Sequence, residues 1–298
     1  MGGWATRYGA AFTGDGVPGR WDGLMRPATG LISFVGAGPG APDLITLRGA
    51  RRLATADVVV WASSLVPAAV LEHCGDGVEA HDSAGMTLED VLGVYEVNPD
   101  AAIVRLHSGD VSLYSALTEQ IAWCVEHERA FEIVPGVGSL AAAAASAGVE
   151  LTVPGVAQSA VLTRLGGGRT AGSMPAGHGI ADFARQGTTM AIYLSAARPD
   201  TLREELLAGY PPQTPAIVVA KASWPDETLI TTTVDGLADA LAASGIRTAA
   251  LVLVGPALSS AGRRSQLYDP AYSHGCRRRS VPGSTAGRAI PVDKRRLP

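Results

Sequence analysis

Three short glycine-containing stretches come directly after apolar runs of strand length. They are residues 36–40 (GAGPG), 108–110 (SGD) and 135–139 (PGVGS). Glycine lets the backbone turn tightly and lets a ligand approach the main chain, and backbone N–H groups at such turns bind nucleotide-like ligands. A tight turn without a ligand explains each stretch by itself. Together they favour a cleft lined by backbone groups.

The first stretch resembles the start of a dinucleotide-binding fingerprint, with Ala41 in place of the third glycine. Two residues disfavour a nicotinamide site. Pro39 lacks the backbone N–H that a pyrophosphate needs, and the acidic residue Asp57 precedes the second apolar run instead of ending it. A nicotinamide-dependent oxidoreductase is therefore a distant alternative.

The other two stretches also have two interpretations. Asp110 follows a buried strand and Gly109, so its carboxylate is expected above the sheet edge. It could bond a ribose or a cationic ligand there, or cap the next helix. Ser139 is a plausible N-cap of the alanine-rich helix that follows it.

A polar cluster, HDSAGM, occupies residues 81–86. Thr87 and Asp90 come next and fit a capping box, which gives them a structural role. His81 and Asp82 are expected on the loop before that helix and have no such role, so both surface and functional interpretations stay open.

Several chemistries are absent from the sequence. It has no G-x-S-x-G, H-E-x-x-H or P-loop motif, and none of its histidines has metal-ligand spacing, so no metal is expected. The three cysteines are far apart, as in reduced cytosolic proteins. The start of the chain does not look like a signal peptide and no apolar run is long enough to span a membrane. A cytoplasmic enzyme is expected.

The elements that position these residues alternate between strands and helices. With 298 residues, 47% of them hydrophobic, the chain can fill two cores. Near-continuous apolar strands predict an α/β fold of two α/β domains with mostly parallel sheets and an inter-domain cleft at the strand ends. The expected strands are 31–35, 57–61, 101–107, 131–134, 157–163, 189–194, 216–220, 229–232 and 249–254, and the expected helices 44–54, 91–95, 115–127, 139–147, 180–185, 201–208 and 237–243.

Composition divides the chain into four parts. Residues 1–30 have eight glycines and no apolar periodicity, which predicts a disordered extension. Residues 31–152 and 153–258 are the predicted N-terminal and C-terminal domains. Residues 259–298 carry a net charge of +7, against −12 for residues 31–258. Their Gly/Ser/Pro-rich composition favours a basic disordered tail over a nucleic-acid-binding arm.

The order of the motifs resembles the tetrapyrrole methylases of corrin biosynthesis. The matching stretches are GAGPGAPDLITLRG, HDSAGMTLED, GDVSLY, EIVPGVGSLAAAAASAGVELTVP, TTMAIYLSA and VAKASWPDE, and they cover about residues 31–258. HDSA-x-M together with ELT-x-P is similar to the branch that methylates precorrin-4 at carbon 11 to give precorrin-5 for cobalamin. The resemblance implies that S-adenosylmethionine binds between two α/β domains, usually in a homodimer.

The resemblance also implies site residues. The cofactor-binding residues would be Pro39, Ser108, Gly109, Asp110, Leu113, Ser139, Leu140, Leu194 and Ala222. The residues facing the tetrapyrrole would be His81, Ser83, Ala84 and Arg164, with Asp82 as the catalytic candidate. Arg105 and Lys221 are further candidates for holding the carboxylates of the substrate.

Two residues depart from the family pattern, because Val111 and Ser115 stand where relatives usually have proline and glycine. A catalytically silent protein that binds S-adenosylmethionine or a tetrapyrrole is therefore an alternative. Uroporphyrinogen-III or precorrin-3 methylation is the other alternative.

Overall fold

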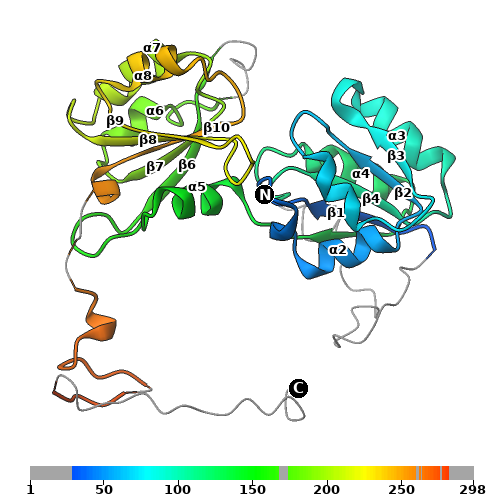
Figure 1. Cartoon of the computed structure of the whole chain (residues 1–298), viewed down its shortest axis with the longest axis horizontal. Coiled ribbons are helices and arrows are strands. Elements are labelled where there is room, and N and C mark those ends of the chain that lie inside the picture. The colour runs from blue at the N-terminus through cyan, green and yellow to red at the C-terminus, as the bar shows by residue number, and fades with distance from the viewer. Residues whose placement is uncertain (1–28, 168–173, 260–261, 263, 276, 282–298) are drawn as a thin grey trace.

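The computed structural model describes residues 29–167, 174–259, 262, 264–275 and 277–281. These residues form two domains, each built on a five-stranded sheet (Figure 1). The predicted α/β fold with two domains is confirmed. The described residues leave out 1–28 and 282–298, which make up most of the two predicted disordered extensions.

The first sheet has the order β3-β2-β4-β1-β5 and is parallel throughout, as predicted. Because β1 lies between β4 and β5, the three glycine-containing turns that follow these strands meet at the carboxyl ends of the strands. The strands are β1 Ile32–Gly36, β2 Val58–Trp61, β3 Glu79–Asp82, β4 Ile103–His107 and β5 Phe131–Val134.

Helices cover both faces of the first sheet. Helix α2 (Leu47–Ala54) packs on one face, and α3 (Leu88–Val97) and α4 (Leu117–Glu126) pack on the other. The predicted capping box at the start of α3 is confirmed, because the hydroxyl of Thr87 accepts from the Asp90 amide and the Asp90 carboxylate accepts from the Thr87 amide. Short 3-10 helices add Pro42–Leu44, Ala68–His73 and Ser83–Gly85.

The second sheet has the order β6-β7-β10-β8-β9. Only β6 and β7 pair in parallel, and β10 runs antiparallel to both of its neighbours. The expectation of a mostly parallel sheet is wrong here, because β8 and β9 form a hairpin and β10 inserts between β7 and β8. The strands are β6 Ala160–Arg164, β7 Thr189–Tyr193, β8 Pro215–Ala220, β9 Thr228–Thr233 and β10 Ala250–Val254.

Helices α6 (Ile180–Ala184), α7 (Pro199–Leu207) and α8 (Leu237–Ser244) cover one face of the second sheet. The other face is covered by α5 (Ser139–Ala147), whose buried alanines pack on β7, β8 and β10. Helix α5 lies within the predicted N-terminal domain, yet it packs with the second sheet (Figure 1). The packing therefore changes from one sheet to the other at residues 135–138.

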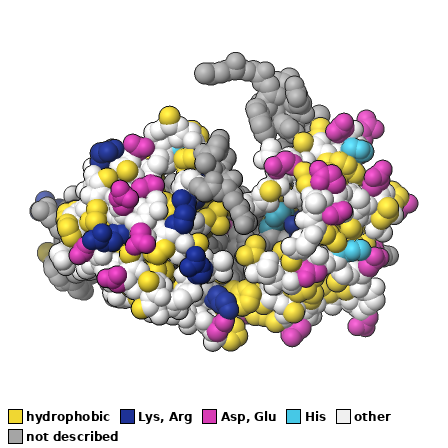
Figure 2. All heavy atoms as spheres, turned by 90° about the horizontal axis from the view of Figure 1, so that it is seen from above, with side chains coloured by type: hydrophobic (Ala, Val, Ile, Leu, Met, Phe, Trp, Pro, Cys, Tyr) yellow, Lys and Arg dark blue, Asp and Glu magenta, His cyan; other side chains and the backbone are white. Residues whose placement is uncertain are grey.

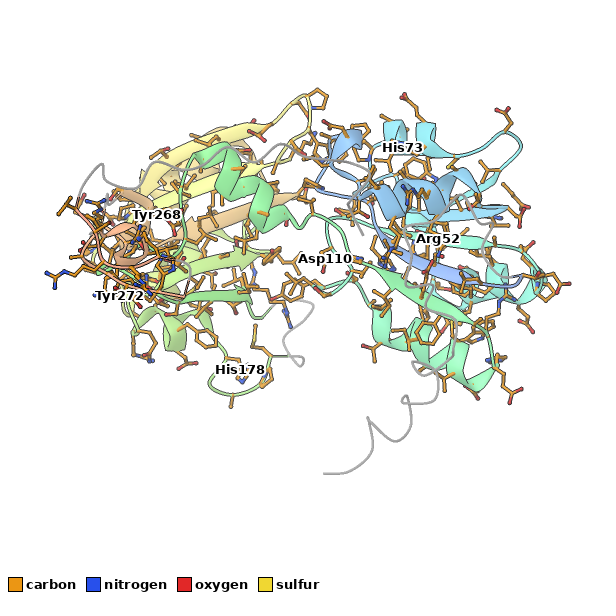
Figure 3. All side chains as sticks on the ribbon, turned by 90° about the horizontal axis from the view of Figure 1, so that it is seen from below. Arg52, His73, Asp110, His178, Tyr268 and Tyr272 are labelled. Atoms are coloured by element: carbon orange, nitrogen blue, oxygen red, sulfur yellow. The ribbon has the colours of Figure 1, made fainter. Side chains whose placement is uncertain are left out.

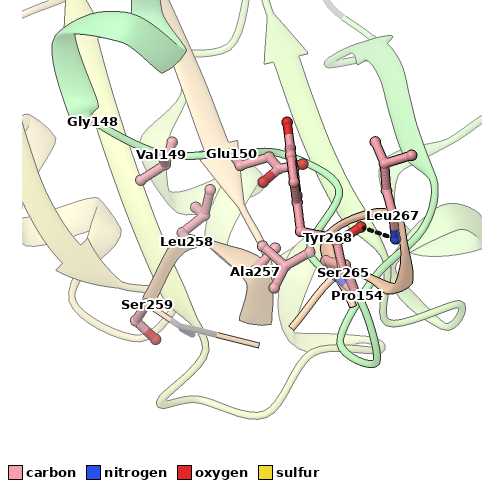
Figure 4. Close-up of a pocket in the computed structure, with 11 residues that line it drawn as sticks. Gly148, Val149, Glu150, Pro154, Ala257, Leu258, Ser259, Ser265, Leu267 and Tyr268 are labelled. Atoms are coloured by element: carbon pink, nitrogen blue, oxygen red, sulfur yellow. Dashed lines mark hydrogen bonds between the residues drawn. The ribbon is translucent and has the colours of Figure 1, made fainter. Parts of the chain in front are cut away.

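Part of the basic tail is described and has local structure. Residues Gln266–Tyr268 form a 3-10 helix, which the Ser265 hydroxyl caps by accepting from the Leu267 amide. Leu267 and Tyr268 line a cavity of about 580 Å³ with Pro154 and Ala257, far from the junction of the two domains (Figures 3 and 4). In the described part of the chain, every helix is too short or too polar to cross a membrane.

Candidate functional site

The three glycine-containing turns of the first sheet are bonded to one another. Gly38 and Gly109 exchange two backbone hydrogen bonds, of 3.2 Å from the Gly38 amide and 2.8 Å from the Gly109 amide. The Ala37 amide donates to the His107 carbonyl at 2.8 Å. The Gly38–Gly109 pair is a separate antiparallel bridge next to the end of the parallel β1–β4 pairing, and it fixes the first two turns against each other.

Glycine is required where the turns approach. A Cβ on Gly36 would lie 2.6 Å from the Cα of Gly136 and 2.7 Å from the Gly109 carbonyl oxygen. A Cβ on Gly136 would lie 2.7 Å from the Cα of Gly36. Such distances are too short for any side chain, so the turns pack backbone against backbone here.

The Asp110 side chain joins the second turn to the third. Its Oδ2 accepts from the Gly136 amide at 2.9 Å, and its Oδ1 accepts from the amide and hydroxyl of Ser112. Burial raises the pKa of Asp110, but these hydrogen bonds and one from the Val111 amide outweigh burial and lower the pKa overall. Asp110 does not cap α4, which begins after Ala116 without a side-chain cap. It lies between the two domains (Figure 3).

A cavity of about 280 Å³ lies beside Asp110, at the junction of the two domains. It brings together six of the nine cofactor-binding residues predicted from sequence, namely Ser108, Gly109, Asp110, Leu113, Ser139 and Leu194. The remaining lining residues are Ala62, Leu65, Arg105, Leu106, His107, Tyr114, Ser115, Gly138 and Tyr193.

The other three predicted cofactor-binding residues lie outside this lining. The Pro39 carbonyl accepts from the indole N–H of Trp224 at 3.0 Å, and the Ala41 amide donates to the Ser223 hydroxyl at 3.0 Å. Residues 39–41 therefore bond to the second domain. Leu140 and Ala222 pack in the core between α5 and the second sheet.

The HDSA residues were expected on a loop, but His81 and Asp82 end the edge strand β3. The strand could not be predicted because it is polar and mostly exposed, and it therefore has no apolar pattern. His81 Nε2 lies 2.9 Å from a Glu79 carboxylate oxygen. Ala84 belongs to the 3-10 helix that follows the strand.

Asp82 and Ser83 both hold backbone in place. Asp82 Oδ1 accepts from the amides of Ser63 and Ala84, each at 3.0 Å. Hydrogen bonds from the Ser63 side chain and from these two amides lower the pKa of Asp82. The Ser83 hydroxyl donates to the Trp61 carbonyl and accepts from Arg105. None of the HDSA residues lines the 280 Å³ cavity.

Two tyrosines were missed by the sequence analysis. Tyr114 and Tyr193 line the cavity from different domains, and their ring centroids are 5.2 Å apart. Burial raises the pKa of Tyr114, and the positive charge of Arg164, at the end of β6, opposes this shift only in part. Tyr193 is the last residue of β7, one residue before the predicted site residue Leu194, and this place next to a strand end was the available signal.

Arg105 and His107 also line the cavity, from β4. Arg105 was predicted from the sequence as a candidate for holding substrate carboxylates, whereas His107 was not predicted as a site residue. His107 is 6% exposed. Burial, together with the smaller effect of the nearby positive charge of Arg105, lowers its pKa to about 3. The imidazole is therefore neutral at neutral pH.

His107 should make stability depend on pH. Its pKa is depressed in the folded protein, so the unfolded chain binds a proton below about pH 6.5 that the folded protein does not bind. The free energy of unfolding should fall by about 2 kcal/mol between pH 6.5 and 4.5. Urea unfolding at these pH values should show most of this slope abolished in His107→Phe. Equal slopes for the two proteins would contradict the assignment.

The charges around the junction are uneven. Figure 2 shows a hollow between the two domains, with Lys and Arg side chains gathered on the second domain near it and Asp and Glu spread over the first domain. An anionic ligand is thus attracted by one wall of the hollow in spite of the acidic net charge of residues 31–258.

Comparison with known proteins gives a consistent result. The family Tetrapyrrole (Corrin/Porphyrin) Methylases matches residues 31–238. A precorrin-4 C(11)-methyltransferase of Rhodococcus erythropolis is 44% identical over 78% of this chain and 93% of its own length.

Two solved structures are also similar. The X-ray structure of a cobalt precorrin-4 methyltransferase is 40% identical, with a TM-score of 0.74 over 77% of this chain and 96% of that one. A Thermus thermophilus uroporphyrin-III C-methyltransferase complexed with S-adenosyl homocysteine is 29% identical, with a TM-score of 0.62 over 77% and 99% of the two chains. The chain therefore belongs to the tetrapyrrole (corrin/porphyrin) methylases.

Proposed function

We propose that this chain transfers a methyl group from S-adenosylmethionine to carbon 11 of precorrin-4, giving precorrin-5 for cobalamin synthesis. The observation that carries the proposal is the identity of 40–44% to proteins named for precorrin-4 or cobalt precorrin-4 methylation, over about four fifths of the chain. The relative named for uroporphyrin-III is less similar, at 29%. The proposal includes a homodimer that acts in the cytoplasm.

The residues at the domain junction suit S-adenosylmethionine. The glycine turns pack backbone against backbone where no side chain fits, and the 280 Å³ cavity opens beside them at Gly109 and Gly138. Ser108, Gly109, Asp110, Leu113, Ser139 and Leu194 would hold the cofactor from this lining, with Pro39, Leu140 and Ala222 supporting it from outside.

The bound cofactor supplies a methyl group already activated by a sulfonium. The protein mainly has to align the electron-rich ring carbon with that methyl group and to exclude water, contributions worth up to ~7–11 kcal/mol. In the proposal His81, Ser83, Ala84 and Arg164 face the macrocycle, and Asp82 is the candidate for the catalytic role. Because hydrogen bonds lower its pKa, Asp82 is a weak proton acceptor and a good anchor for the HDSA segment.

The test is to locate the new methyl group. The protein is incubated with S-adenosylmethionine labelled with carbon-13 in its methyl group and with a precorrin-4-generating mixture, once metal-free and once with cobalt. Mass spectrometry should show the gain of one methyl group, and carbon NMR should place it at carbon 11. A label at carbon 2, 7, 17 or 20 would overturn the specific reaction, and binding without turnover would favour the catalytically silent alternative.

Asp110→Ala is expected to weaken S-adenosylhomocysteine binding by about 1.5 kcal/mol, or roughly tenfold, the low end for hydrogen bonds to a charged group. The reason is that Asp110 joins the second glycine turn to the third. Titration calorimetry measures the effect. Asp90→Ala, which removes a carboxylate from the capping box of α3, is the matched control. Equal affinities in wild type and Asp110→Ala would remove Asp110 from the cofactor site.

A further inference from the structure

Two neighbouring polar side chains of β4 face the 280 Å³ cavity. Arg105 and His107 are two residues apart on one strand, so their side chains point to the same face of the sheet. Both line the cavity, on the α3 and α4 side of the first sheet. The ring centroid of His107 lies 6.2 Å from that of Phe34, which holds the imidazole against the core.

The guanidinium of Arg105 is only partly bonded. Its Nη1 donates to the Ser83 hydroxyl at 2.9 Å and to the carbonyls of Val60 and Leu106 at 3.3 Å each. Its Nε is buried and has no hydrogen-bond partner among the described residues. A buried N–H without an acceptor is unfavourable, and more so on a charged group.

His107 also has a nitrogen without a hydrogen-bond partner. Its Nε2 is buried and has no partner within the part of the chain that the structure describes. With 6% of the residue exposed, water reaches it poorly. Two adjacent side chains in one cavity thus each have a buried nitrogen in need of a partner, which is rare in folded proteins and indicates a missing ligand group.

No anion in the described structure balances Arg105. Asp110 is the sole carboxylate among the described lining residues, and both of its oxygens are bonded elsewhere, to Ser112 and Gly136. Arg105 is partly buried, and an arginine keeps its charge in such a place, so this end of the cavity carries a positive charge without a described counter-ion. A partly buried charge without a partner favours the binding of a group of opposite charge.

We propose that Arg105 and His107 form a carboxylate-binding subsite within the cavity, filled by a carboxylate of a bound ligand. A guanidinium binds a carboxylate more strongly than a neutral donor does, and a neutral imidazole can donate its Nε2 proton to the second oxygen. The proposal rests on the proposed function for its two sources of carboxylate. One is the amino-acid end of the cofactor, and the other is an acetate or propionate of the tetrapyrrole.

Binding experiments on the full chain distinguish the sources without requiring turnover. The probes are S-adenosylhomocysteine, 5′-methylthioadenosine, which lacks the amino-acid part, and uroporphyrin III, which carries eight carboxylates. If the subsite holds the cofactor, Arg105→Gln should weaken the binding of S-adenosylhomocysteine at least tenfold. The affinity for 5′-methylthioadenosine should stay within twofold of wild type. If the subsite holds the macrocycle, only the affinity for uroporphyrin III should fall by at least tenfold.

Arg129→Gln is the matched control. Arg129 is an arginine of the same domain that donates to the carbonyls of Gly30, Asn98 and Ala101. It lies away from the cavity lining, so its loss should lower stability and leave all three affinities within twofold.

His107→Gln provides a second variant if Arg105→Gln does not fold. It should reproduce the same pattern of affinities with a smaller loss, of about threefold to fivefold. All three affinities within twofold of wild type in the folded variants would overturn the subsite. An equal loss for all three probes would also overturn it, because that result marks a collapsed cavity. Either result would leave the proposed methylation reaction standing, since that is tested by product analysis.

Discussion

The Gly136→Ala protein is expected to lose about 100-fold in turnover and about 1–3 kcal/mol of stability. The added Cβ would collide with the Gly109 carbonyl and lie 2.7 Å from the Cα of Gly36, so the three turns must separate. Overpacking of this kind costs about 1–3 kcal/mol, and a displacement of about 1 Å at a reacting centre costs about 100-fold in rate. Turnover under saturating substrates and urea unfolding measure the two effects.

Gly93→Ala is the matched control for this variant. Gly93 lies inside α3, and a Cβ there would meet nothing within 4 Å. Alanine should therefore stabilise the helix by about 0.5–1 kcal/mol and leave turnover unchanged. Wild-type turnover in Gly136→Ala would show that the close approach of the turns is not needed for the reaction.

Asp82→Ala should lower turnover at saturating substrate by about 100-fold and leave the affinity for S-adenosylhomocysteine unchanged. The reason is that Asp82 Oδ1 holds the amides of Ser63 and Ala84 in place. Without this carboxylate the HDSA segment should shift relative to the bound tetrapyrrole macrocycle. Steady-state kinetics and calorimetry measure the two quantities.

Asp82→Asn separates positioning from proton transfer. Asparagine keeps an oxygen that can accept from both amides, but it cannot take up a proton at neutral pH. If Asp82 acts by position, Asp82→Asn should keep turnover within about threefold of wild type. A loss as large as that of Asp82→Ala would instead give Asp82 the role of proton acceptor.

The sequence was sufficient to predict the parallel sheet of the first domain, because its central strands are continuous apolar runs that end in glycine-containing turns. The resemblance to the tetrapyrrole methylases also implied six residues that meet at the cavity. The strand β3 could not be predicted in this way, since an exposed edge strand of sequence EAHD has no apolar face.

The antiparallel pairing in the second domain has a signal in the sequence, namely the short connection between β8 and β9. Residues 221–227 connect β8 to β9. A parallel pair needs a crossover of a dozen or more residues, so this short connection requires a hairpin. His107 could not be predicted as a site residue, because its importance comes from an unpartnered buried nitrogen that only the three-dimensional structure reveals. Arg105 was a candidate from the sequence, but its unpartnered Nε is likewise visible only in the structure.

The position of α5 has a consequence for how the protein folds. This helix follows β5 of the first sheet directly, yet its alanines bury one face of the second sheet. A fragment cut at residue 152 would leave that face of β7, β8 and β10 without its cover, and the other fragment would carry a helix with nothing to pack against. The two halves are therefore not autonomous folding units. Their unfolding should be a single cooperative transition, so damage on either side of the junction is transmitted to the whole chain.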